Sequence, residues 1–126
     1  MPNTRSSRVL AASAALVLSM SLAACGGGDD NSGSASSDAC PSDSVVIKMA
    51  NIKFDPEKTT AGVGETVCWE NDDTVDHNAV ANSGADFKSP LFGKGQTFST
   101  TVNTPGTVQY ECTVHPGMTG EITVER

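Results

Sequence analysis

The sequence has few histidines, no internal repeat and no long segment with the period of a helix. Two of its 126 residues are histidine. From about residue 40 onward, short runs of β-branched residues are separated by Gly, Pro, Asn and Asp. The missing helical period argues against a helix bundle. The short, separated runs predict an all-β Greek-key sandwich or barrel of about seven to eight strands.

The chain also lacks an apolar run long enough to cross a membrane as a stable helix. The run from Val9 to Met20 follows two arginines and has the build of an export signal. It leads into LAACG at residues 22–26, which resembles the lipobox of bacterial lipoproteins, where the cysteine carries two or three acyl chains. We therefore expect residues 1–24 to be a lipoprotein signal peptide and Cys25 to be lipidated. The alternative is an ordinary cleavage site with an unrelated cysteine.

Basic residues are scarce, with 8 Lys and Arg against 15 Asp and Glu and a formal net charge of −7. Removal of residues 1–24 would take two arginines away and leave a formal charge of −9. This acidity argues against nucleic acid and anionic lipid surfaces as partners. It favours a protein partner with a basic surface.

Residues 25–39 contain Gly, Ser, Asp and Asn but no large apolar residue. We expect them to form a flexible tether with a root-mean-square span of about 20 Å. Residues 40–126 are then the folded domain. We expect this domain to be a monomer, exported and held by lipid on the extracytoplasmic side of the cell membrane.

Several segments of the domain alternate between apolar and polar residues, as strands do. In segment 45–54 the apolar residues fall on both faces, so one regular strand cannot bury them all, and we expect a bulge near Ala50 or Asn51. Residues 82–95 lack alternation and are expected to be a long loop anchored in the core by Leu91 and Phe92. The remaining strands are expected at residues 66–70, 96–102, 107–112 and 121–125.

The four cysteines need separate explanations in an exported chain. If Cys25 carries lipid, Cys40 lies just before the first strand and Cys68 faces away from the side that holds Trp69. We predict a disulfide between Cys40 and Cys68, with two unpaired buried thiols as the alternative. Cys112 is then left as an odd thiol.

Cys112 begins the segment Cys112-Thr-Val-His115-Pro-Gly-Met118. A thiolate, an imidazole and a thioether together suit copper far better than magnesium or calcium, and the thioether argues against structural zinc. The other histidine, His77, follows an acidic loop at residues 71–76. A sandwich can bring this loop beside the Cys112 segment, because its strand connections collect at two ends.

Over about residues 43–126 the chain resembles the cupredoxins, the small blue copper proteins. The residues that carry this resemblance are FDP at 54–56, VGETVCWEN at 63–71, HN at 77–78 and YECTVHPGM at 110–118. The spacing Cys-x-x-His-x-x-Met is similar to the short ligand loop of amicyanin-like members, and plastocyanin-like members are also near. The resemblance implies one copper ion, cycling between Cu(I) and Cu(II). Its implied ligands are His77, Cys112, His115 and Met118.

The resemblance also implies roles around the copper. Asn78 would tie the two ligand loops together by hydrogen bonds. The edge of His115 would be the exit for the electron, with Pro116 beside it. An acidic set near His77 would steer a basic redox partner, although a merely solvated acidic loop is an equal alternative. This acidic set consists of Glu70, Asp72, Asp73 and Asp76.

Two places depart from the common pattern of that family. Asp76 and Val114 stand where members often have proline. A carboxylate at residue 76, beside a ligand, is expected to favour Cu(II) and lower the reduction potential.

With all four ligand positions filled, no coordination place remains for a substrate. The resemblance therefore implies an electron carrier that shuttles single electrons between extracytoplasmic redox partners, and not an enzyme. A surface lipoprotein that binds or buffers copper without carrying electrons is the alternative.

Overall fold

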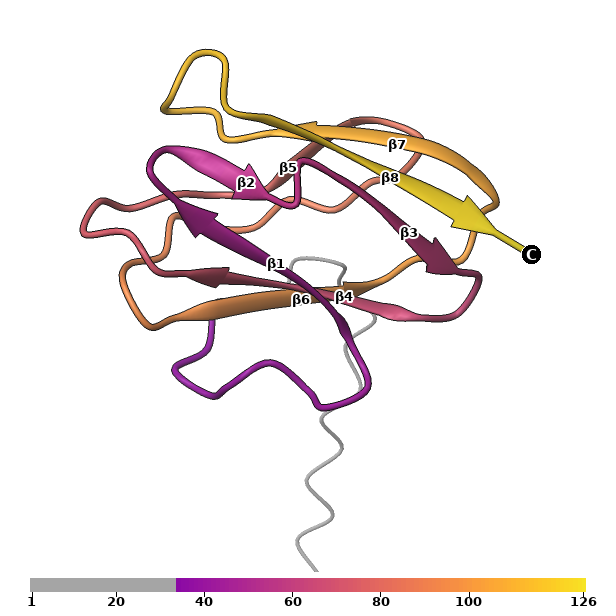
Figure 1. The fold of residues 1–126 in the computed structure, drawn as a ribbon, viewed down its shortest axis with the longest axis horizontal. Coiled ribbons are helices and arrows are strands. Elements are labelled where there is room, and N and C mark those ends of the chain that lie inside the picture. Colours follow the sequence, from indigo (N-terminus) through magenta and orange to yellow (C-terminus); the bar gives the residue numbers. More distant parts are fainter. Residues whose placement is uncertain (1–33) are drawn as a thin grey trace, which may run out of the picture.

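The computed structural model describes residues 34–126, which contain eight strands in two sheets (Figure 1). The expected signal peptide, the lipidated Cys25 and the tether up to residue 33 lie outside the described residues. No helix occurs within 34–126, and the predicted all-β sandwich is confirmed. The strands are β1 (Val45–Ala50), β2 (Lys53–Asp55), β3 (Lys58–Gly62), β4 (Thr66–Asn71), β5 (Val80–Ser83), β6 (Thr97–Thr101), β7 (Gly106–Glu111) and β8 (Thr119–Glu125).

The two sheets have the strand orders β2-β1-β4-β6 and β3-β8-β7-β5. Strands β1 and β4 are parallel, as are β3 and β8, while the other paired strands are antiparallel. The chain changes sheet after β2, β3, β4, β5 and β6. In Figure 1 the loops that follow β4 and β7 lie at the same end of the sandwich, on the left.

The core between the sheets is built around aromatic side chains. Trp69 on β4 is fully buried, and its ring centroid lies 5.4 Å from that of Tyr110 on β7 and 5.0 Å from that of Phe87. Such pairs stabilise a core beyond the area they bury. Contact between Trp69 and Tyr110 joins the two sheets through β4 and β7, the strands whose following loops meet at one end.

The turn between β1 and β2 differs from the expected bulge. Asn51 and Ile52 have φ values of 53° and 57°, and the chain reverses there so that Met49 pairs with Phe54 across an antiparallel hairpin. Positive φ at both central residues is the geometry of a two-residue hairpin turn that twists with its strands, and Asn favours it. The prediction of a bulge near Ala50 or Asn51 is therefore wrong. The reversal buries Phe54 and leaves Ile52 exposed.

Two edge strands and one loop anchor also differ from the expectation. The sequence pattern does not predict β3, which buries only Ala61, and it places the end of β5 inside the long loop 82–95. Both strands lie at sheet edges and bury at most one side chain, so their sequences show little alternation of apolar and polar residues. Phe92 anchors the loop as predicted, but Leu91 is 50% exposed and does not. Phe87 is buried in its place.

A disulfide joins Cys40 to Cys68, with an S–S distance of 2.03 Å. Before it, the backbone of Ser36 pairs with Thr97 on β6 through N–O distances of 2.8 and 2.7 Å. The hydroxyl of Thr97 also donates to the carbonyl of Asp38 at 2.8 Å. The chain is thus attached to an edge strand a few residues before residue 40, the expected start of the domain.

Candidate metal centre

Two loops at the same end of the sandwich bring together the thiol and both imidazoles. The loop between β4 and β5 carries His77, and the loop between β7 and β8 carries Cys112 and His115. Cys112 Sγ lies 3.8 Å from His77 Nδ1 and 3.4 Å from His115 Nδ1, and the two Nδ1 atoms are 3.1 Å apart. His77 and Cys112 are buried, while His115 is half-buried. Three donor atoms from residues up to 38 positions apart therefore converge on one point.

The shorter loop is closed by its own backbone. The N–H of Cys112 donates to the carbonyl of Met118 at 2.9 Å, and the N–H of Met118 donates to the carbonyl of His115 at 3.1 Å. Gly117 has a φ of 85°, a backbone conformation that costs glycine little and other residues more. Met118 is buried at the end of this turn, so the four predicted ligand positions all lie within two loops.

Asn78 joins the two loops. Its Oδ1 accepts the backbone N–H of Thr113 at 2.8 Å, and its Nδ2 donates to the Thr113 hydroxyl at 2.8 Å. Asn78 directly follows His77, and Thr113 directly follows Cys112. The pair of bonds therefore fixes the two loops relative to each other one residue away from the converging donors.

Asn71, at the end of β4, organises the longer loop, a role that the strand pattern around it does not predict. This fully buried side chain donates to the carbonyls of Val75 and Phe92 at 2.9 and 2.8 Å, and its Oδ1 accepts the N–H of Asp73 at 2.8 Å. The signal in the sequence is an Asn at a strand end, followed two residues later by a residue whose N–H it can accept. Phe92 also exchanges backbone hydrogen bonds with His77, so the loop is braced from both sides.

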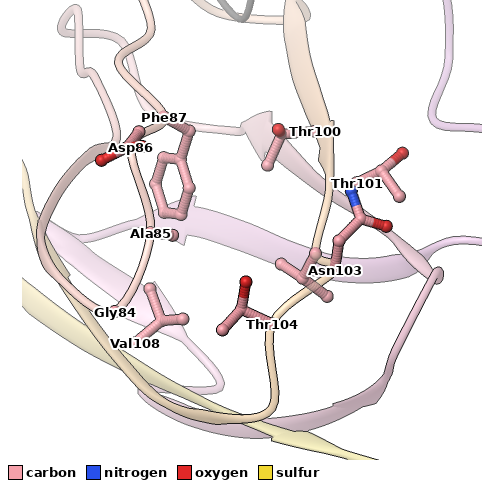
Figure 2. A pocket seen from close by; sticks show the side chains of 10 residues that line it. Gly84, Ala85, Asp86, Phe87, Thr100, Thr101, Asn103, Thr104 and Val108 are labelled. Carbon is pink, nitrogen blue, oxygen red and sulfur yellow. The ribbon is translucent and has the colours of Figure 1, made fainter.

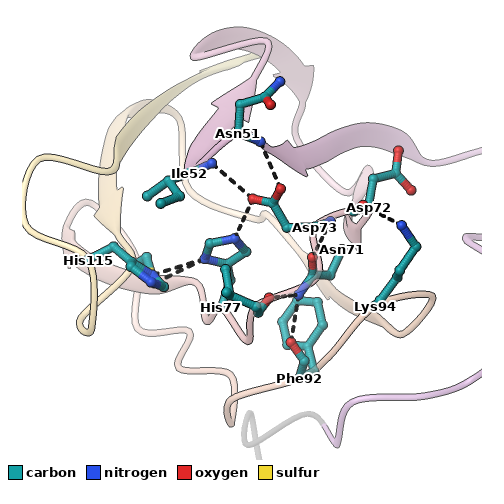
Figure 3. A network of polar contacts seen from close by, with 11 residues as sticks. Asn51, Ile52, Asn71, Asp72, Asp73, His77, Phe92, Lys94 and His115 are labelled. Carbon is teal, nitrogen blue, oxygen red and sulfur yellow. Dashed lines mark hydrogen bonds and ion pairs between the residues drawn. The ribbon is translucent and has the colours of Figure 1, made fainter.

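The Asp73 carboxylate points into the loop, as Figure 3 shows. Its Oδ1 accepts the N–H of Asn51 at 2.9 Å, and its Oδ2 accepts the N–H of Ile52 at 2.9 Å. The same Oδ2 lies 2.8 Å from Nε2 of His77. The N–H of Ile52, followed by the hydrogen bond with His77, holds the pKa of Asp73 below its usual range. Asp73 is ionised at neutral pH and is engaged inward.

The other residues of the predicted acidic set face outward. Glu70 and Asp72 lie 3.6 and 3.0 Å from the Nζ of Lys48, so part of their charge is compensated. Asp76 is exposed. The predicted docking set therefore reduces to three outward acids, because only 19% of the Asp73 side chain is exposed.

Apolar side chains lie exposed beside both ligand loops. Val114 precedes His115 in the chain, and Val75 lies two residues before His77. Leu91 is next to Phe92, which pairs with His77. Exposed apolar residues that gather at one end of a soluble domain often mark a contact surface.

The donors fit a copper ion. Two atoms that share one metal ion at bond lengths of about 2.0–2.3 Å lie no more than about 4.6 Å apart, and the three distances here are all shorter. An ionised Asp73 can only accept at Nε2 of His77, so the tautomer that this contact favours leaves the lone pair of Nδ1 facing Cys112. Cys112 is the free cysteine of residues 34–126. One thiolate, two imidazoles and a thioether nearby are a soft donor set that favours copper.

A depression of about 130 Å³ lies elsewhere, beside the first half of β7 and the loop after β6 (Figure 2). Phe87 and Val108 form part of its wall, together with the polar Thr100, Thr104 and Asn103. None of the four predicted ligands lines this depression.

Comparison with known proteins supports this assignment. The family profile of copper-binding proteins of the plastocyanin/azurin family matches residues 41–125. Amicyanin-alpha of Methylorubrum extorquens is 36% identical over 89 residues, which cover 68% of this chain and 75% of that protein. Amicyanin of Paracoccus denitrificans is 35% identical over 85 residues, which cover 64% of this chain and 65% of that protein.

Solved structures agree with these sequence relatives. One is the oxidised form of an amicyanin variant in which a proline is replaced by alanine. It aligns with a TM-score of 0.67 and 32% sequence identity, and the alignment covers 73% of this chain and 92% of the amicyanin chain. Another is the reduced form of an amicyanin variant in which a tryptophan is replaced by tyrosine. It aligns with a TM-score of 0.68 and 30% identity, and the alignment covers 77% of this chain and 95% of the amicyanin chain. The sequence match spans most of the described domain, and the fold and the converging donors agree with it. The chain therefore belongs to the plastocyanin/azurin family of copper-binding proteins.

Proposed function

We propose that this protein is a membrane-anchored electron carrier that holds one type 1 copper ion through His77, Cys112, His115 and Met118. The observation that carries this proposal is the convergence of Cys112 Sγ with the Nδ1 atoms of both histidines, which come from two neighbouring loops. The family match to copper-binding proteins supports the choice of metal. The relatives named amicyanin and plastocyanin support electron transfer as the activity.

Bound copper would supply a one-electron couple between Cu(I) and Cu(II). The chain supplies a site that need not rearrange when the charge changes. Asn78 holds the two loops together, and the backbone bonds of the shorter loop hold Cys112 near Met118. Burial of His77 and Cys112 excludes water from the donors, and four filled positions leave no place for a substrate.

Electrons would enter and leave through His115. It is half-buried, whereas His77 is fully buried, and it lies between the exposed Val114 and Pro116. A partner docking on this apolar rim would bring its own redox centre close to the imidazole edge. The outward acids Glu70, Asp72 and Asp76 would favour a partner with a basic surface. A transfer rate that does not change with ionic strength would contradict this steering.

The anchor is a proposal from the sequence alone, since residues 1–33 lie outside the described part. None of the described residues forms a helix that could span a membrane. The disulfide between Cys40 and Cys68 supports an oxidising, extracytoplasmic location. Acylation of Cys25 would then hold the domain at the membrane surface. A mature protein whose mass shows no acyl chain on Cys25 would contradict the anchor.

A visible spectrum tests the site directly. Addition of Cu(II) to the full chain is expected to produce a strong thiolate-to-copper absorption band. Cys112→Ser is expected to abolish the band completely, because the serine hydroxyl cannot replace the thiolate. Cys25→Ser is the matched control and should leave the band unchanged. A band that survives in Cys112→Ser, or none in the unmodified protein, would overturn the assignment of the ligands.

The same protein distinguishes a carrier from a copper buffer. A carrier is expected to show a reversible one-electron potential and fast electron self-exchange. A buffer would hold copper as colourless Cu(I) and would show no reversible oxidation. The second result would leave the metal site in place but would overturn the electron-carrier function.

A further inference from the structure

Among the acids near the site, Asp73 alone contacts a proposed ligand in the described part of the chain. Its Oδ2 lies 2.8 Å from His77 Nε2, on the side of the ring opposite to Nδ1. We propose that Asp73 is a positioning residue that fixes the His77 ring and, through its negative charge, favours the oxidised state of the bound copper. This inference rests on the proposed function.

The first support is that Asp73 is itself held in place. Its two oxygens accept the N–H groups of Asn51 and Ile52, and its own N–H donates to Oδ1 of Asn71. Asn51 and Ile52 form the β1–β2 turn, so the carboxylate, which belongs to the loop after β4, is hydrogen-bonded to a turn that lies more than 20 residues earlier in the chain. Figure 3 shows these contacts around one carboxylate. A carboxylate with both oxygens occupied cannot swing away from His77 without breaking bonds.

The second support is the direction of the imidazole. An ionised Asp73 can only accept a hydrogen bond from Nε2–H of His77. In that tautomer Nδ1 carries a lone pair, and it lies 3.8 Å from Cys112 Sγ and 3.1 Å from His115 Nδ1. The hydrogen bond thus sets both the tautomer and the orientation of a buried ring. Partners of this kind raise the basicity of a metal-ligating imidazole, and their loss typically costs about 10–100-fold in metal affinity or activity.

The third support is electrostatic. A fixed negative charge near a metal stabilises the state with the higher positive charge, and the effect is strongest where water is excluded. His77 is fully buried, so the contact with Asp73 is poorly screened. Asp76 adjoins His77 in the chain but is exposed, and Asp72 faces Lys48. The sequence suggests that the carboxylate of Asp76 favours Cu(II) and lowers the reduction potential. The contacts of the structure instead favour Asp73 for this role.

Asp73→Asn tests the proposal with little change in shape. The amide oxygen can still accept from Ile52 or His77, but its NH₂ group then meets the N–H of Asn51. The ratio of Cu(I) to Cu(II) affinity is expected to shift about tenfold toward Cu(I). For a one-electron couple this shift equals a rise of about 59 mV in the reduction potential. Asp72→Asn and Asp76→Asn remove the same charge without the contact and are expected to shift the ratio less than about threefold.

A second measurement uses the metal-free protein. The Nε2 proton of His77 is expected to give a slowly exchanging NMR signal in the unmodified chain, because the proton is buried and hydrogen-bonded. Asp73→Asn should broaden or remove this signal, whereas Asp76→Asn should retain it. These readouts separate positioning from simple bracing of the turn, which would lower stability without moving the potential.

Two outcomes would overturn the inference. The first is a potential in Asp73→Asn equal to that of the Asp72→Asn and Asp76→Asn controls. The second is an unchanged His77 proton signal in the metal-free variant. If the unmodified protein itself formed no thiolate-to-copper band, the proposed function would fail instead, and the NMR comparison would still report on the contact between Asp73 and His77.

Discussion

The two ligand loops differ in how they are held. In the loop from β4 to β5, His77 is fully buried and is hydrogen-bonded to the Asp73 carboxylate and to the backbone of Phe92. Asn71 is in turn hydrogen-bonded to the backbones of both Asp73 and Phe92. The loop from β7 to β8 is held by two backbone bonds of its own and by Asn78, and most of its residues are exposed. The first loop is built to fix a ligand. The second places a half-buried His115 where a partner can reach it.

The largest expected effect comes from breaking the brace of the longer loop. Asn71→Ala removes two donors and one acceptor from a fully buried position, leaving the carbonyl of Phe92 without its side-chain partner. We expect the free energy of unfolding to fall by about 2–4 kcal/mol, measured by chemical denaturation of the metal-free protein. The exposed Asn103→Ala is the control and should change it by less than about 0.5 kcal/mol. Equal losses in both variants would show that Asn71 does not brace the loop.

An intermediate effect is expected when the two loops are separated. Asn78→Ala removes both hydrogen bonds between the buried Asn78 and Thr113, which is itself exposed to water. We expect a loss of about 1–2 kcal/mol in the free energy of unfolding and a shifted thiolate-to-copper band, because Cys112 adjoins the freed residue. Thr113→Val keeps the backbone bond and removes only the hydroxyl, so its effect should be smaller. A larger effect in Thr113→Val would contradict the view that the Asn78 oxygen is the main tie.

The smallest effect on stability is expected on the exposed rim of the shorter loop. Val114 is 48% exposed, so Val114→Ser should change the free energy of unfolding by less than about 0.5 kcal/mol. Electron self-exchange should nevertheless slow several-fold, because apolar contact near His115 brings two molecules together. Val63→Ser is the matched control, since Val63 is 44% exposed beyond β3 and precedes β4 at the other end of the sandwich. A similar slowing in both variants would argue against docking at Val114.

The four predicted ligands differ in how far the spacing of residues in the sequence predicts that they lie together. Cys112, His115 and Met118 lie within seven residues, so their spacing alone suggests a shared turn. His77 lies 35 residues before Cys112, and its inclusion depends on the resemblance to the cupredoxins and on the scarcity of histidines. The structure brings all three donor atoms together, but only the spectrum of the copper-loaded protein tests their role as ligands.

The acidic loop shows the opposite case. Asp72, Asp73 and Asp76 look alike in the sequence, which predicts an outward docking role for all three. Asp73 turns inward because the N–H groups of the β1–β2 turn, 21 and 22 residues earlier, are close to it in the fold. The β1–β2 turn requires positive φ values at its two central residues, and the apolar pattern of residues 45–54 does not predict them.

The sequence by itself determined the all-β class, the main buried strands and the short ligand loop, because alternation and close spacing are local properties of the chain. The tertiary structure alone decided the β1–β2 hairpin, the edge strands β3 and β5, and the choice of Asp73 over Asp76 as the partner of His77. The physical reason is that these features depend on hydrogen bonds between segments far apart in the sequence. Such bonds exist only once the two sheets have set the positions of their loops.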